Sequence, residues 1–271
     1  MFNAACDCHV HVIDDPERYP LSPERGYEPP QAPLANYRRF QERSGLSRAV
    51  LVQPSVYGFD NRLLRETISQ DRQGLRGIVV PAPHTPVYEF EAMHADGVCG
   101  VRVNLLNSGG LNLDDIEPWL PILRALKWHL QVQIDVNTMA DTLDSAIAYG
   151  LPVVVDHFGF PRTSTAIDDP GIANLLTHLR TGRCWVKLSA AYRLSTQTAP
   201  PYSDLDNMVA ALVEAAPGRV VWASDWPHTE CPPPGPNSLA QRALVDRWLP
   251  DPELRQKILV DNPAYLYRFG A

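Results

Sequence analysis

Eight short apolar runs recur along the chain, separated by segments with helical patterning. They are rich in Val, Ile and Leu and span residues 4–12, 48–55, 75–82, 97–106, 130–136, 152–159, 184–190 and 219–227. Runs of this length and composition are typical of parallel strands buried on both faces. Eight such strands within 271 residues predict a single-domain (β/α)8 TIM barrel spanning residues 1–271. An open doubly wound sheet is the alternative, but no glycine-rich dinucleotide loop follows any of the runs.

The connecting segments supply the predicted helices. Residues 60–71 start on Asp60, a good N-cap residue, and place one apolar face at Leu63, Leu64 and Ile68. Residues 251–270 predict a closing helix, a turn at Asn262-Pro263 and a short apolar end that packs on the barrel. No internal repeat interrupts this pattern.

Three proline-rich segments follow the ends of predicted strands. They span residues 14–33, 190–204 and 228–238. Barrel enzymes place their working loops at the carboxyl ends of the strands. We therefore expect these segments to form the lids or walls of one site.

The charge and cysteine content narrow the classes of partner. A formal net charge of −7 disfavours binding to nucleic acid or to anionic membranes, since nothing offsets phosphate repulsion over the whole surface. No apolar run approaches the roughly 20 residues of a membrane helix. The first residues show no basic region followed by an apolar run, so we do not expect a secretory signal. Five cysteines, an odd number, indicate reduced thiols in a cytoplasmic protein. The sequence leaves the oligomeric state open.

Polar residues cluster where the predicted strands end. His9 and His11 are one residue apart on the first strand, so both face the barrel axis. His157 ends the sixth strand and Asp225 ends the eighth. Three imidazoles and a carboxylate can bind one divalent metal, or they can polarise a carbonyl while the aspartate takes a proton from water. Cys6 and Cys8 precede the histidines on the strand, so we expect them to lie lower in the barrel, away from this site.

Six motifs occur in order on or just after the predicted strands: HVH (9–11), QPSVYGFDN (53–61), GVRVN (100–104), DHFG (156–159), WVKLSAAYRLS (185–195) and WASDWPH (222–228). Together they resemble the amidohydrolase superfamily, and within it the branch of sugar-lactone and 2-pyrone-4,6-dicarboxylate lactonases. The resemblance covers nearly the whole chain. It implies a distorted barrel, hydrolysis of a lactone in aromatic compound catabolism, Asp225 as general base, and His9, His11 and His157 as catalytic residues.

The chain departs from the superfamily pattern at its metal site. Many members hold two metals with a modified lysine on the fourth strand and a histidine on the fifth. Here these strands end in Arg102 and Asn104, and in Gln133 and Asp135. A binuclear centre is therefore not expected, and the resemblance implies either no metal or one divalent ion, zinc, held by His9, His11, His157 and Asp225.

The chain also departs from the pyrone-dicarboxylate lactonase in its arginines. Arg102 and Arg193 match two that hold substrate carboxylates, but Asn107 and Phe160 stand where two others are expected, and Arg162 lies close by. We therefore expect a small anionic lactone of the pyrone-dicarboxylate, muconolactone or sugar-acid type, with one anionic group. The residues predicted to bind it are Arg102, Arg193, Gln53, Ser55, Tyr57, Asn61 and His228.

Two other functions fit the same residues. The superfamily includes metal-dependent non-oxidative decarboxylases with a similar first-strand histidine pair and eighth-strand aspartate. A barrel that has lost catalysis and only binds a ligand is the other alternative, which the complete set of three histidines and one aspartate disfavours. Lys187 is expected to be a structural partner low in the barrel rather than a nucleophile.

Overall fold

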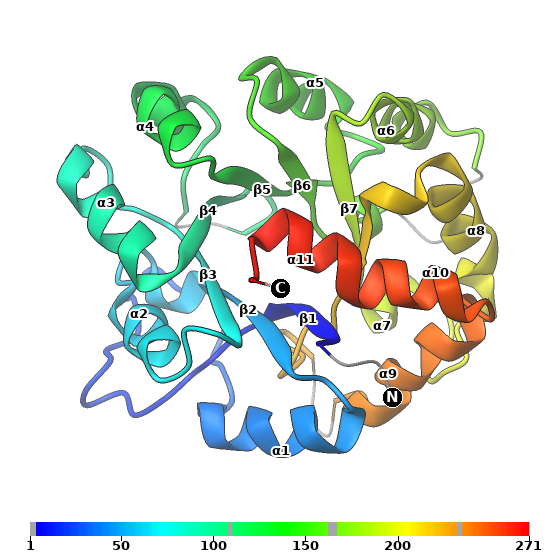
Figure 1. Ribbon diagram of the computed structural model, residues 1–271, viewed down its shortest axis with the longest axis horizontal. Helices are drawn as coiled ribbons and strands as arrows, with labels where there is room; N and C mark the ends of the chain where they lie inside the picture. The colour runs from blue at the N-terminus through cyan, green and yellow to red at the C-terminus, as the bar shows by residue number, and fades with distance from the viewer. Residues whose placement is uncertain (1–3, 108–109, 162–166, 232–234, 271) are drawn as a thin grey trace.

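The computed structural model describes residues 4–107, 110–161, 167–231 and 235–270. Its strands are β1 Cys6–Val10, β2 Arg48–Val52, β3 Leu75–Val79, β4 Val98–Asn104, β5 His129–Gln133, β6 Val153–Val155, β7 Cys184–Leu188 and β8 Val220–Trp222. They form one parallel sheet in sequential order, β1 to β8 (Figure 1). Each predicted run overlaps one strand, and β5 begins one residue before its run. The sequential strand order confirms the barrel and excludes the doubly wound sheet, whose strand order reverses at a switch point.

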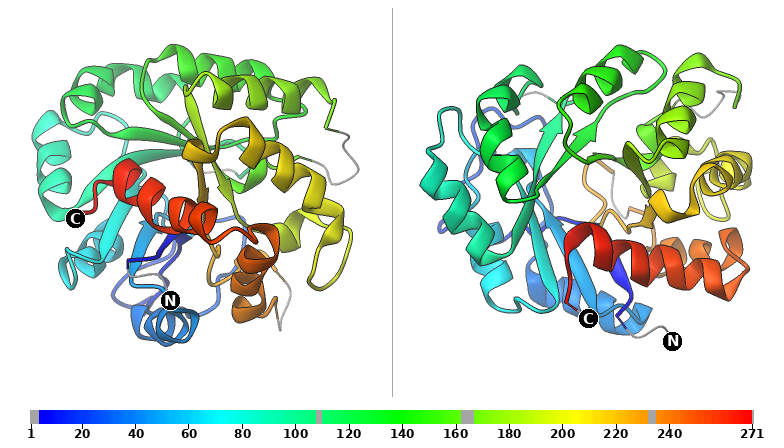
Figure 2. Two further views of the ribbon diagram at one scale, coloured as in Figure 1. Left: turned by 45° about the vertical axis from the view of Figure 1, so that its right-hand side comes forward. Right: turned by 45° about the horizontal axis from the view of Figure 1, so that its top comes forward.

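Helices surround the strands on the outside of the barrel (Figures 1 and 2). They are α1 Leu34–Ser44, α2 Arg62–Ser69, α3 Val87–Asp96, α4 Leu120–Ala125, α5 Ala140–Ala148, α6 Pro170–Arg180, α7 Ala191–Leu194, α8 Asp206–Ala215, α9 Ser238–Trp248, α10 Pro252–Gln256 and α11 Asn262–Tyr267. The predicted apolar face of α2 is buried. Its N-cap position is Asn61 and not Asp60, although the Asp60 carboxylate still accepts the Arg62 N–H at 3.1 Å.

The predicted turn at Asn262-Pro263 is wrong, because the chain stays helical through this dipeptide. A π-helical segment, Lys257–Asp261, leads directly into α11, and Pro263 lies in the first turn of that helix. A proline inside a helix removes one hydrogen bond of the ladder, and here it follows the π-helical turn, where the ladder already changes register. The Asn262 amide instead donates to the carbonyls of Pro217 and Val220 at 2.8 and 2.7 Å.

The last helix closes the amino-terminal end of the barrel, where α11 crosses in front of the strands (Figure 1). Leu266, Tyr267 and Phe269 pack there in one apolar cluster that includes Cys6 and Cys8. The two thiols therefore lie low in the barrel, as predicted. All five cysteines are unpaired, and Cys231 is the one that is partly exposed.

Strands β1 and β8 close the barrel through a single bridge and not through a full ladder. Val10 pairs with Trp226 beyond the end of β8, where the His11 N–H donates to the Trp226 carbonyl at 2.8 Å. The buried Asp7 carboxylate holds this seam, since it accepts the N–H of Ser224 at 2.8 Å and its hydroxyl at 2.5 Å. This irregular closure is the distortion that the resemblance implied.

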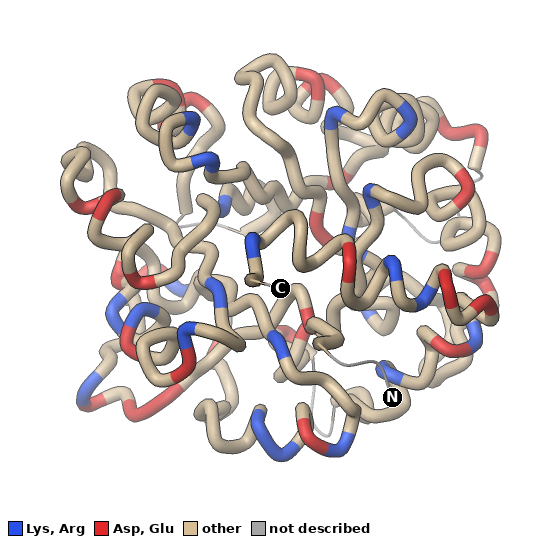
Figure 3. Tube along the Cα trace, in the orientation of Figure 1, with Lys and Arg blue, Asp and Glu red and all other residues tan. Residues whose placement is uncertain are grey.

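Acidic and basic residues are interspersed around the outer helices (Figure 3). Among the described residues, no helix has the length and apolar character needed to cross a membrane.

Candidate functional site

A β-bulge in β1 aims the two histidines into the barrel. Asp7 pairs with Ala49 and Val10 with Leu51, so β1 contains one residue more than β2 over this stretch. Such a bulge changes the side to which successive residues point. As a result Cys8 lies in the inner apolar cluster although the next residue, His9, also faces inward. His9 and His11 then face the same side, as predicted, and their Nε2 atoms are 3.2 Å apart.

Asp225 lies at the centre of the imidazole cluster. Its Oδ1 is 3.7 Å from His9 Nε2, 3.9 Å from His11 Nε2 and 3.8 Å from His157 Nε2. All four side chains are almost completely buried. Asp225 has a left-handed backbone with φ of 61°, which a short polar side chain tolerates. The four residues predicted to be catalytic therefore meet at one point.

Each imidazole is oriented by a partner on its other nitrogen. His11 Nδ1 donates to the Val52 carbonyl at 2.8 Å, and His157 Nδ1 is 2.7 Å from Ser189 Oγ. A carbonyl can only accept, so neutral His11 carries its proton on Nδ1 and presents a lone pair at Nε2. It cannot donate a hydrogen bond to the centre in that form. Ser189 can donate or accept, so His157 can present either an N–H or a lone pair.

His9 contacts an ion pair below the centre. Its Nδ1 is 3.3 Å from Asp156 Oδ1 and 3.2 Å from Lys187 Nζ, and these two groups pair at 3.0 Å. Gln131 donates a further hydrogen bond to Asp156 at 2.9 Å. Lys187 is completely buried in this contact, which confirms its predicted structural placement. The pair fixes the orientation of the His9 ring.

Burial sets the protonation states of the cluster. It lowers the pKa of His11 to about 3 and holds the pKa of His9 and His157 well below the usual value, so the imidazoles are neutral at pH 7. Burial also raises the pKa of Asp225 to about 6, although Arg193 and a hydrogen bond from Tyr192 act in the opposite direction. A carboxylate with this pKa is ionised at pH 7 and is a better base than an exposed one.

Burial would raise the pKa of Asp156 too, but the neighbouring Lys187 and His9 outweigh it and hold that pKa well below the ordinary value. Asp156 is therefore the permanent anion of the interior. Asp225, in contrast, is the carboxylate that can be protonated and deprotonated near neutral pH. The two aspartates have different roles because only Asp156 lies against an ammonium group.

Tyr192 supports Asp225 from the loop after β7. Its hydroxyl donates to Asp225 Oδ2 at 2.8 Å, which leaves Oδ1 facing the three imidazoles. The ring also packs edge-on against His228, with centroids 5.2 Å apart. No role was predicted for Tyr192, although it precedes Arg193 in the YRLS motif.

Arg102 lies inside the barrel, below the mouth. Its Nη1 donates to the Gln53 carbonyl at 3.1 Å and its Nη2 to Gln133 Oε1 at 2.5 Å. Its Nε is buried, lies 3.9 Å from Asp156 Oδ2 and has no hydrogen-bond partner among the described residues. Arg102 thus supplies positive charge to the site while two of its nitrogens are already bound.

Arg193 lies at the rim and is paired with Glu230. Arg193 Nη2 donates to Glu230 Oε2 at 2.8 Å, and the guanidinium lies over the Phe160 ring. Tyr27, from the first proline-rich segment, lies beside Ser55 and beside Thr229 of the third segment. The three proline-rich segments therefore all contribute side chains to the mouth. Arg162 lies outside the described residues.

The other predicted binding residues are not all brought to the centre. Gln53 donates to the Asp60 carbonyl at 2.8 Å, and Tyr57 accepts the Asp14 N–H at 3.1 Å. Both side chains therefore fix the backbone of the loops after β2 and β1. Asn61 donates to the Val80 carbonyl at 2.8 Å and accepts the Val80 N–H at 3.0 Å, which ties α2 to the end of β3. These side chains support the wall of the mouth and do not reach its floor.

His228 lies beside the centre. Its Nε2 is 2.8 Å from Ser238 Oγ, whereas its buried Nδ1 has no partner among the described residues. Burial lowers the pKa of His228 to about 4, so the ring is neutral.

The donor set fits one divalent ion. His9, His157 and Asp225 offer ligand atoms within 4.8 Å of one another. Zinc held by nitrogen at about 2.0–2.1 Å spaces tetrahedral ligands by roughly 3.4 Å, close to the separations between the histidine nitrogens and Asp225. Metal-binding histidines usually donate their other N–H to a carboxylate, a carbonyl or a similar acceptor, and Asp156, Val52 and Ser189 occupy those positions here.

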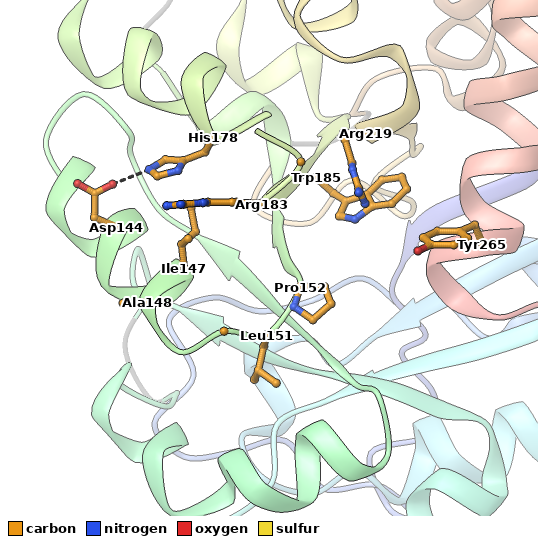
Figure 4. A pocket seen from close by; sticks show the side chains of 12 residues that line it. Asp144, Ile147, Ala148, Leu151, Pro152, His178, Arg183, Trp185, Arg219 and Tyr265 are labelled. Carbon is orange, nitrogen blue, oxygen red and sulfur yellow. Dashed lines mark hydrogen bonds and ion pairs between the residues drawn. The ribbon is translucent and has the colours of Figure 1, made fainter. Parts of the chain in front are cut away.

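A cleft of about 620 Å³ lies at the opposite end of the barrel. Figure 4 shows it lined by Trp185, Arg219 and Tyr265 on one side and by His178 and Arg183 on the other. Trp185 lies at the start of β7, Arg183 and Arg219 directly precede β7 and β8, and the other two belong to α6 and α11, so the cleft is at the amino-terminal face. It shares no residue with the mouth, and barrel enzymes keep their chemistry at the carboxyl-terminal face.

A family model described as Amidohydrolase matches residues 6–269. The chain belongs to the amidohydrolase family. This amidohydrolase is 33% identical over 268 residues to 4-sulfomuconolactone hydrolase of Rhizobium radiobacter, covering 97% of this chain and 89% of the relative. It is 30% identical over 278 residues to 2-pyrone-4,6-dicarboxylate hydrolase of Comamonas testosteroni, covering 97% and 90%.

Solved structures agree with this assignment. The amidohydrolase superposes on a protein from Pseudomonas putida described as a 2-pyrone-4,6-dicarboxylic acid hydrolase, with a TM-score of 0.87, 31% identity and full coverage of both chains. A 2,6-dihydroxybenzoate decarboxylase from Rhizobium shares only the fold, at 11% identity and a TM-score of 0.66 over 98% of this chain and 99% of that one.

The sequence missed residues that act through others. Asp156, Tyr192 and Glu230 each bind a predicted site residue, and each stands next to or close to one in the sequence. Asp156 could have been found, because it directly precedes His157 at a strand end. Glu230 could not, since its partners come from other loops.

Proposed function

We propose that this amidohydrolase hydrolyses a small lactone that carries a carboxylate, with Asp225 as general base. The observation that carries the proposal is the position of the Asp225 carboxylate, within 4 Å of three oriented imidazoles at the catalytic end of the barrel. The named functions of its relatives, opening of sulfomuconolactone and of pyrone-dicarboxylate, support a cyclic ester as the substrate class. A role in aromatic compound catabolism fits the names of the same relatives. A cytoplasmic location, expected from the odd number of cysteines, is part of the proposal.

The reaction uses one water molecule. Asp225 Oδ1 takes a proton from the water, and the water oxygen forms a bond to the lactone carbonyl carbon. The tetrahedral intermediate then breaks the bond between that carbon and the ring oxygen. The proton held by Asp225 passes to the departing oxygen, so the product is an open hydroxy acid or its keto form. Tyr192 keeps Oδ2 occupied and leaves Oδ1 free for both transfers.

The site must stabilise the negative charge that develops on the carbonyl oxygen. His157 can do so directly through Nε2–H, because its Nδ1 can accept from Ser189. Neutral His11 cannot, since its proton is committed to Val52. A divalent ion bound by His9, His11, His157 and Asp225 would polarise the carbonyl as a Lewis acid. Arg102 supplies the positive charge that attracts an anionic lactone, while Arg193 lies at the rim in its pair with Glu230. Ser55 and His228 lie beside the ring.

Replacing the base tests the proposal. Asp225→Asn should bind the lactone but lower kcat by about a hundredfold or more, which is the usual contribution of a general base. Asp144→Asn is the matched control, because Asp144 pairs with His178 at the opposite face. The assay follows ring opening of sulfomuconolactone, muconolactone, pyrone-dicarboxylate and a sugar-acid lactone. An Asp225→Asn protein within threefold of the parent would reject the assignment.

The decarboxylase alternative rests on a likeness of fold alone to the 2,6-dihydroxybenzoate decarboxylase structure. No contact in the described site favours it over hydrolysis. Release of CO2 from 2,6-dihydroxybenzoate by the parent protein, without turnover of any lactone, would favour the decarboxylase over the lactone hydrolase.

A further inference from the structure

Glu230 brings a second carboxylate to the mouth, outside the Asp225 centre. Its Oε2 accepts from Arg193 Nη2 at 2.8 Å, and its Oε1 accepts from Asn107 Nδ2 at 2.5 Å. Donors from the loops after β4 and β7 thus hold both oxygens of one side chain from the loop after β8. A pair of converging donors of this kind is how proteins bind the carboxylate of a ligand.

This position is next to the reacting centre. The Arg193 guanidinium lies 5.0 Å from the centre of the Phe160 ring, and that ring packs edge-on against His157. The residue before Arg193, Tyr192, donates to Asp225. The Arg193 and Glu230 side chains are only 17% and 26% exposed, so water screens their charges incompletely. A substrate group that extends from the centre toward the rim meets this pair.

The charges of the described site already balance. Lys187 pairs with Asp156 at 3.0 Å, and Arg193 pairs with Glu230 at 2.8 Å. Arg102 is then the remaining cation and Asp225 the remaining anion. One carboxylate on the substrate can lie close to Arg102. A second one would need Arg193, whose charge Glu230 has already neutralised.

We propose that Glu230 occupies, as an internal carboxylate, the anion position formed by Arg193 and Asn107, and that it thereby makes the mouth select lactones with one carboxylate over lactones with two. The inference rests on the proposed lactone hydrolysis and names its substrate class. Specificity arises here by exclusion, because a dicarboxylate must displace Glu230 or lie beside it against like-charge repulsion.

Removing the charge of Glu230 tests the proposal. Glu230→Gln keeps the size of the side chain but frees the charge of Arg193. We expect the KM for 2-pyrone-4,6-dicarboxylate to fall about tenfold relative to the KM for a 2-pyrone with one carboxylate, with kcat changed less than threefold. Glu89→Gln is the matched control, because it removes the same charge from the exposed Arg65 pair between α2 and α3 and should leave both KM values unchanged.

A binding measurement separates this inference from the proposed function. Calorimetry of benzene-1,3-dicarboxylate and of benzoate requires no turnover, and Glu230→Gln should tighten binding of the dicarboxylate alone by about fivefold or more. If the parent opened no lactone, the proposed function would fail, but the ratio of the two dissociation constants, dicarboxylate to benzoate, would still decide the role of Glu230. If Glu230→Gln changed this ratio by less than twofold, the inference would be overturned. If Glu230→Gln did not fold, Glu230→Ala would give the same readings.

Discussion

At the residue scale, the pKa of Asp225 is set by its surroundings. Burial raises its pKa to about 6, while Tyr192 and Arg193 limit that rise. Asp156, which contacts the other nitrogen of the His9 ring and is equally buried, is kept ionised by Lys187. The same side-chain type therefore supplies a base in one position and a fixed anion in the other.

The Tyr192 contact predicts a pH effect. Asp225 must be ionised to act as a base, so kcat/KM should fall as the pH drops through about 6. Tyr192→Phe removes a hydrogen bond that favours the ionised form of Asp225. The acidic limb of the plot of kcat/KM against pH should therefore move to higher pH. Tyr149→Phe, which loses only a bond to the Leu113 carbonyl, is the control. A limb that stays in place for Tyr192→Phe would contradict this role.

The ligand set predicts a metal stoichiometry. We expect protein loaded with zinc and then passed through a desalting column to hold no more than one equivalent, because Arg102 and Gln133 occupy the ends of β4 and β5. Any zinc that is bound should be lost in His157→Ala and retained in His178→Ala, which alters the opposite face. Elemental analysis gives the count, and two equivalents in the parent protein would be incompatible with this site.

At the element scale, the strand ends are positioned by contacts that leave no spare room. The first turn of α6 lies against the segment after β5, where a Cβ built on Gly171 would be 1.9 Å from the Val136 carbonyl oxygen. The β-bulge in β1 and the bridge from Val10 to Trp226 similarly fix the backbone that carries His9, His11 and Asp225. The geometry of the site therefore depends on the packing of elements that are not part of it.

The contact at Gly171 predicts a loss of stability. Gly171→Ala should lower the free energy of unfolding by about 1–3 kcal/mol or more, because the backbone of two elements must separate. Gly218→Ala is the control, since a Cβ there meets nothing within 4 Å. Urea denaturation followed by circular dichroism measures both. Equal midpoints for the two variants would show that α6 can shift at little cost.

At the scale of the whole molecule, the barrel has one working end and one closed end. The three proline-rich segments contribute side chains at the carboxyl ends of the strands, and α11 covers the amino ends. The cleft at the closed end has a volume of about 620 Å³ (Figure 4), and none of the residues that line it belongs to the imidazole cluster.

The closed end predicts the reactivity of the thiols. Cys6, Cys8, Cys99 and Cys184 are at most 1% exposed, so only Cys231 should react quickly with Ellman's reagent in the native protein. All five should react after unfolding in guanidinium chloride. The variant Cys231→Ser should show no fast phase. Two or more fast thiols in the native protein would mean that the amino-terminal end is open.

The amino-acid sequence by itself determined the eight strands, their order and the residues at their carboxyl ends, because burial on both faces leaves a local pattern of apolar runs. It also determined that His9, His11, His157 and Asp225 would meet, since parallel strands in a closed barrel bring those ends together. The tertiary structure alone decided what each of them touches. The bulge in β1, the Asp156 and Lys187 pair and the tautomer of His11 depend on contacts between strands.

The pairing of Glu230 shows why such contacts escape sequence reasoning. Its partners Arg193 and Asn107 lie 37 and 123 positions away, on loops whose path is set by the whole barrel. A salt bridge between loops has no periodicity and no fixed spacing, so nothing in the local sequence marks it. Only the three-dimensional arrangement could show that one of the two predicted arginine clamps already holds a carboxylate of the chain itself.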